Sequence, residues 1–161
     1  MSEAIIHLLV PLVIILIVSF FYKLDKKMIL ILSIFSLLPD IDFFMGWHRA
    51  TFHNLFFGVI LVIIAVLVLK KYYSKAKIAL VGSYFFLSHL VLDGFLVAWF
   101  YPFQQFHYNP FTGTKVTLEQ MNAIRPHYPI KYFFIEILFI LLIYLILGYF
   151  FYFKNNNNKT K

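Results

Sequence analysis

The sequence contains no cysteine and few charged residues. Without cysteine it can form no disulfide, no thiolate nucleophile and no zinc–thiolate site, so any metal must be bound by nitrogen and oxygen atoms. Only 13% of the 161 residues are charged, whereas 62% are hydrophobic and the mean hydropathy is +0.84. This balance lies far from that of soluble domains and indicates an integral membrane protein.

Several catalytic motifs are also absent from the sequence. It has no G-x-S-x-G, no G-x-x-x-x-G-K-[ST], no G-x-G-x-x-G and no H-E-x-x-H. Serine hydrolases, nucleotide-dependent enzymes and zincin proteases therefore lack support. Water activated by a metal ion remains the available nucleophile.

Five apolar runs occupy most of the chain: 4–22, 28–45, 54–69, 78–101 and 130–153. As helices rising about 1.5 Å per residue, such runs cross a hydrocarbon core of about 30 Å. We expect an all-α fold, a polytopic membrane helix bundle of about five transmembrane helices. Residues 1–153 form a single domain, 154–161 form a polar cytoplasmic tail, and 102–129 form one long connection.

Ten lysines lie in alternate loops and predict the orientation of the chain. They separate runs one and two, separate runs three and four, and follow run five. By the positive-inside rule these loops and the C-terminus are cytoplasmic, so five spans leave the N-terminus outside the cell membrane. The net charge of +7 is thus explained by topology and by contacts with membrane lipids, and no nucleic-acid partner is expected.

Five acidic and histidine side chains are predicted to share one depth in the outer half of the membrane. Counted from the cytoplasmic lysines, they lie roughly 18 to 25 Å up their helices. They are Asp40, Asp42, His53, His89 and Asp93. Aspartates at such depth cost about 2.5–3.5 kcal/mol each, so the group requires a compensating cation.

Local spacing favours metal ligation. His89 and Asp93 are four residues apart, which places them on one face of a helix. Pro39 biases Leu38 away from helical geometry, so the second run is expected to break near Asp40. His48, in the short outer loop, completes the predicted ligand set. We expect one or two divalent ions, with zinc favoured.

Other polar residues leave more than one interpretation open. Arg49 could bind phosphate oxygens or extend to lipid headgroups. Glu136 could be a ligand, a general base or an interfacial carboxylate, and His107 and His127 could complete the site or only belong to the long connection. His7 is alone near the outer end of the first run, and we expect it to be an ordinary interfacial histidine.

The segments "PDID", "HRATFH" and "SHLVLDGF", followed by "YPF", resemble the membrane-bound metal-dependent hydrolases, also described as LexA-binding, inner-membrane-associated hydrolases. The match in order and spacing covers residues 37–103. Family members usually have H-R-G-x-T-H-S where this chain has "HRATFHN", so the histidines and the arginine are kept while the glycine, threonine and serine are not. The resemblance implies a hydrolase.

The combined prediction is a metal-dependent hydrolase with an outward-facing site that acts on a phosphoester of a lipid or another amphiphile. The ion would lower the pKa of bound water towards about 7 and polarise the bond to be cleaved. Arg49 and Glu136 are the predicted catalytic residues. The alternative is a non-enzymatic divalent metal carrier or sensor, which would need polar residues through the cytoplasmic half as well. A third possibility is a polar layer that only fixes helix packing.

Overall fold

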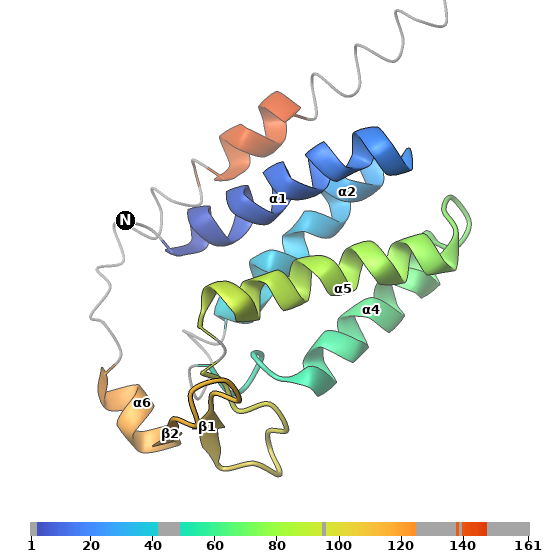
Figure 1. The fold of residues 1–161 in the computed structure, drawn as a ribbon. Helices are drawn as coiled ribbons and strands as arrows, with labels where there is room; N and C mark the ends of the chain where they lie inside the picture. Colours follow the sequence, from blue (N-terminus) through green and yellow to red (C-terminus); the bar gives the residue numbers. More distant parts are fainter. Residues whose placement is uncertain (1–2, 42–48, 95, 125–137, 139, 148–161) are drawn as a thin grey trace, which may run out of the picture.

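The chain folds mainly into helices, with one small sheet (Figure 1). The computed structural model describes residues 3–41, 49–94, 96–124, 138 and 140–147. The elements in chain order are α1 (Glu3–Tyr22), α2 (Lys26–Leu32), η1 (Ser33–Ser36), η2 (Leu38–Ile41), α4 (Leu55–Leu69), α5 (Lys75–Leu92), β1 (Phe106–Tyr108), β2 (Lys115–Thr117) and α6 (Leu118–Ile124).

The helices run back and forth between two ends of the molecule. The lysine-rich turns that join α1 to α2 and α4 to α5 lie at one end, and the β1–β2 hairpin and α6 lie at the other (Figure 1). Helix α5 contacts α1, α2 and α4. This arrangement brings the start of α1, the end of α5, η2 and the segment before α4 to the same end.

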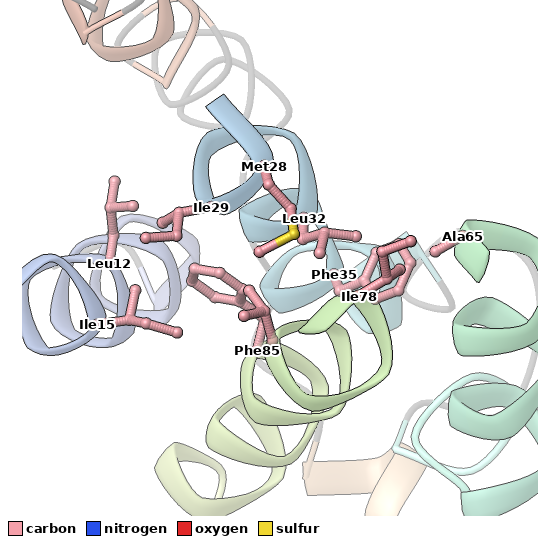
Figure 2. Packing of buried hydrophobic residues seen from close by; sticks show 10 residues of the cluster. Leu12, Ile15, Met28, Ile29, Leu32, Phe35, Ala65, Ile78 and Phe85 are labelled. Carbon is pink, nitrogen blue, oxygen red and sulfur yellow. The ribbon is translucent and has the colours of Figure 1, made fainter. Parts of the chain in front are cut away.

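A mainly apolar core fills the space between the helices near the lysine-rich turns. Figure 2 shows side chains from α1, α2, η1, α4 and α5 meeting there. The buried cluster consists of Leu12, Ile15, Met28, Ile29, Leu32, Phe35, Ala65, Ile78, Val81 and Phe85. Because the helices are apolar on their outward faces as well, close packing of these side chains, and not their removal from water, holds the helices together.

The outward faces of the helices are apolar too. Ile17 on α1, Ile63 and Leu67 on α4, and Leu80 on α5 are among many large hydrophobic side chains at least half exposed. A soluble monomer rarely exposes so much apolar surface, so these faces suit contact with lipid. Among the described residues, α1 over Ala4–Tyr22 and α5 are long and apolar enough to cross a membrane.

The second predicted run, 28–45, is not one helix. Helix α2 ends at Leu32, and the chain continues as the two 3₁₀ turns η1 and η2. The hydroxyls of Ser33 and Ser36 bond to the carbonyls of Leu30 and Ser33, which competes with regular helix geometry. Pro39 then has no N–H to donate, so the predicted break occurs, although it starts earlier than expected.

The fourth run, 78–101, is also shorter than predicted. Helix α5 ends at Leu92, where Asp93 is the C-cap and Gly94 adopts a positive φ of 71°. A left-handed residue after the cap terminates a helix, and glycine takes that conformation without steric cost. The apolar residues beyond it therefore form turns that pack on the hairpin rather than a further stretch of helix.

The long connection 102–129 contains structure that the sequence prediction missed. β1 and β2 pair antiparallel with His107 opposite Val116, and α6 follows directly. The fold is thus mostly helical rather than purely all-α. The fifth run lies largely outside the described residues, but 140–147 are helical and the Tyr144 hydroxyl lies 2.6 Å from Ser33 Oγ. The predicted 154–161 tail lies outside them entirely.

Candidate metal centre

His89 and Asp93 form the centre of a buried polar cluster at the end of α5. Their side chains lie on one helix face, with His89 Nε2 3.4 Å from Asp93 Oδ2. His89 Nδ1 lies 2.8 Å from the carbonyl oxygen of Ser36. Because a carbonyl only accepts, Nδ1 carries the proton and donates it, and the neutral ring presents its lone pair at Nε2. A bond of this kind commonly orients a metal-binding histidine.

The segment before α4 brings His53 to this pair. Its Nε2 lies 2.9 Å from His89 Nε2 and 3.1 Å from Asp93 Oδ2. Asn54 fixes the segment, because its carbonyl oxygen caps α4 at the Phe57 N–H while its amide donates to the carbonyls of Ala50 and Thr51. The cap thus holds His53 directly before the first turn of α4.

Asp40, on η2, approaches the two imidazoles from another side. Its Oδ1 lies 3.6 Å from His89 Nε2 and 3.8 Å from His53 Nε2. The 3₁₀ turn carries the carboxylate towards the bundle, and 29% of the side chain remains exposed, against 4% for Asp93. Asp40 is therefore the ligand candidate nearest to an opening of the site.

His7 also belongs to the cluster, contrary to the sequence prediction. It projects from the first turns of α1, with Nε2 3.5 Å from Asp93 Oδ1 and Nδ1 3.6 Å from Asp40 Oδ2. Its ring centroid lies 4.3 Å from that of His89. Counted back from Lys23, His7 is roughly 24 Å up its helix, at the depth of the other ligands. Depth along the helix, which identified the other ligands, would therefore have identified His7 as well.

Arg49 contacts Asp93 twice. Its Nη2 lies 3.1 Å from Asp93 Oδ1, and Nη1 donates to the Asp93 carbonyl oxygen at 3.3 Å. The backbone of Arg49 is left-handed, with φ 59°, and its carbonyl accepts from the Ala98 N–H. A non-glycine residue in this region is uncommon, so the bonds on both sides hold the arginine in an otherwise unfavourable conformation.

The structure therefore brings together four of the six predicted ligands and the predicted arginine. Asp42, His48, Glu136 and His127 lie outside the described residues. His107 is buried on β1, but it is in neither of the described groups whose atoms could hold an ion. Of the two interpretations of His107, the one in which it completes the site thus gains no support.

Two overlapping sets of side chains could bind a metal ion. One is His7, His89 and Asp93, and the other is Asp40, His53 and His89; within each set the ligand atoms lie within 4.8 Å of one another. Three buried atoms in these sets, namely His7 Nδ1, Asp40 Oδ2 and Asp93 Oδ2, make no well-aligned hydrogen bond, although imidazole nitrogens or carboxylate oxygens of the cluster lie 3.1 to 3.6 Å from them. Buried polar atoms are rarely left unpaired, so a positive ion fits the cluster.

No curated protein and no solved structure matches the chain. A family model, described as YdjM inner membrane protein, matches residues 1–157. The match agrees with the exposed apolar faces of α1, α4 and α5, and it confirms the expected membrane location and the inner-membrane part of the resemblance. The chain therefore belongs to the YdjM inner membrane protein family.

Proposed function

We propose that this protein is a membrane-embedded, metal-dependent hydrolase that cleaves a phosphoester of a lipid or another amphiphile. The observation that carries the proposal is the convergence of three imidazoles and two carboxylates, drawn from four separate segments, on one small volume. The contacts among these groups leave several buried atoms without a well-aligned hydrogen bond, whereas a bound cation would be coordinated by the carboxylates and imidazoles together.

The donor set favours zinc. Imidazole nitrogens and carboxylate oxygens are typical zinc ligands, and an open position beside them is typical of catalytic sites. His89 has a single free lone pair, at Nε2, so it can bind one ion only. Because His89 belongs to both ligand sets, either one ion takes ligands from both sets or a second ion is bound without His89. A bound zinc would activate water and polarise the scissile group.

The remaining groups supply the other parts of a hydrolytic site. The more exposed Asp40 has a second oxygen that could accept a proton, and Glu136 is the other candidate base. The Arg49 guanidinium carries five N–H groups, of which two donor nitrogens reach Asp93, so further donors remain for a phosphate oxygen. Asp93 and Arg49 thus form an ion pair within the site.

We further propose five spans, with the site in the outer half of the membrane and the C-terminus in the cytoplasm. The lysine-rich turns lie at the end of the bundle opposite the polar cluster, in agreement with the positive-inside rule (Figure 1). A lipid could then present its headgroup to the site from the surrounding leaflet.

The carrier alternative is less well supported. A carrier needs a polar path through the whole membrane, but the core between the site and the lysine-rich turns consists of side chains such as Leu12, Met28, Leu32 and Phe85 (Figure 2). An apolar barrier of this kind opposes the passage of a charged ion. A site open on one side suits an enzyme better.

The test compares metal content and hydrolysis in purified protein. We expect Asp93→Ala to lose bound metal together with metal-dependent turnover of a panel of lipid phosphomonoesters and phosphodiesters. Asp25→Ala is the matched control, because this carboxylate caps α2 at the opposite end of the bundle. Wild-type protein that turns over no member of the panel in the presence of zinc would contradict the hydrolase.

A further inference from the structure

A narrow apolar groove runs between α4 and α5. Its walls come from Leu55, Val59 and Ile63 on one side and from Ser83 and Leu87 on the other, and its volume is about 270 Å³. Ser83 supplies the one hydroxyl among otherwise apolar lining side chains. The rim residues Val59, Ile63 and Leu87 are about half exposed, so the groove opens on the surface that faces lipid.

The groove exists because a glycine allows a close helix contact. Gly58 and Phe86 are buried at its base, and a Cβ added at Gly58 would lie 2.5 Å from Phe86 Cε1. Only glycine therefore lets the ring approach the α4 backbone so closely. The exposed side chains beside this contact line the groove.

The lining and the position of the groove favour a hydrocarbon chain as its occupant. From Leu55 to Ile63 the groove extends along α4 for roughly 12 Å, and apart from Ser83 its lining residues are apolar. The groove opens on the surface that faces lipid, and the surrounding bilayer supplies hydrocarbon chains.

The groove ends next to the candidate metal centre. Leu55, at its outer end, is two residues from His53, so their Cα atoms are at most about 7 Å apart. On the other wall, Leu87 is two residues before His89, so the groove ends at the level of this ligand, although the two side chains point to different faces of α5. A lipid with its tail in the groove would have its headgroup at the turn that carries the ligands.

We propose that the α4–α5 groove binds one acyl chain of the lipid substrate and so selects long-chain amphiphiles; the substrate assignment rests on the proposed hydrolase. Burial of the chain would orient the headgroup before reaction, because tail contacts lower the entropy cost of positioning the reacting group. Short-chain phosphoesters would lack this contribution.

The test uses two neighbouring isoleucines on α4. Ile63 lines the groove and Ile64 does not, yet their exposed fractions are 52% and 51%. In vesicles that contain a phosphatidylcholine with a photoreactive group on its acyl chain, we expect wild-type crosslinks to concentrate on the groove residues. Ile63→Trp should reduce them several-fold, whereas Ile64→Trp should leave them unchanged. Val59→Phe is a second groove-filling variant if Ile63→Trp does not fold.

Kinetics with long-chain and short-chain phosphoesters form the second part of the test. Ile63→Trp should raise the KM for the long-chain substrate several-fold and leave the KM for the short-chain one and the metal content unchanged. Crosslinks spread evenly over the lipid-facing residues, or crosslinks between two copies of the chain through this face, would overturn the groove proposal. If the wild type hydrolyses neither substrate, the hydrolase fails, and the crosslinks alone decide whether the groove binds an acyl chain.

Discussion

Replacement of Arg49 by alanine tests whether the arginine holds a metal ligand in place. The guanidinium bonds to both the side chain and the backbone of Asp93, through Nη2 to Oδ1 at 3.1 Å and through Nη1 to the carbonyl at 3.3 Å. Asp93 in turn contacts His53, His89 and His7. Arg49 therefore fixes the carboxylate that touches every imidazole of the cluster.

The expected loss of metal affinity follows from these bonds between Arg49 and the predicted ligand Asp93. Removal of a group that orients a metal ligand typically lowers metal affinity by about 10- to 100-fold, or roughly 1.4 to 2.7 kcal/mol. Only 4% of the Asp93 side chain is exposed, so water cannot easily replace the lost donors. Arg49→Lys keeps the charge but not the forked geometry, and we expect an intermediate affinity.

Competition between the protein and a chelator of known zinc affinity measures the effect in detergent. Arg49→Ala should release zinc at a lower chelator concentration than the wild type, and Asp25→Ala should behave as the wild type. If Arg49→Ala keeps full zinc affinity and loses only turnover, then the arginine acts on the substrate alone and the positioning argument is wrong.

Three further predictions concern the site and its orientation. His7→Ala should lower zinc affinity as strongly as Asp40→Ala, measured by the same competition, whereas equal affinity to the wild type would return His7 to a structural role. Removal of a metal present at 100 times its dissociation constant should lower unfolding stability by about 2.7 kcal/mol, seen as a lower Tm in a thermal melt, and an unchanged Tm would favour a polar layer that only packs helices. A cysteine at Ser74 should resist an impermeant thiol reagent in intact cells while one at Thr112 reacts, and the reverse labelling would place the site on the cytoplasmic side.

Depth along a helix predicted that several polar residues lie together. Asp40, His53, His89 and Asp93 come from segments far apart in sequence, and the structure brings their side chains together although the chain between Leu32 and Asp40 is not regular α-helix. The same count applies to His7, which lies at the same depth on the first run. Its partners come from other helices, so only the combined topology identifies it.

Helix ends and loops were predicted less well because tertiary contacts decide them. The apolar runs continue past Leu32 and Leu92, but the regular helices end there. The hydroxyls of Ser33 and Ser36 end α2, and Gly94 ends α5. The β1–β2 hairpin depends on pairing between residues whose sequence shows no strong alternation. Hydropathy measures the environment of a segment and does not determine its backbone conformation.

The departures from the family pattern at 50 and 54 leave the His53 position intact. Ala50 stands where relatives usually have glycine, but the left-handed residue here is Arg49, so position 50 does not require glycine. Its methyl group is buried beside Ala98 and Leu118. Asn54 caps α4 and also donates two amide hydrogen bonds to the preceding turn. The Asn54 side chain therefore holds the backbone that carries His53, and the position of this ligand requires neither glycine at 50 nor serine at 54.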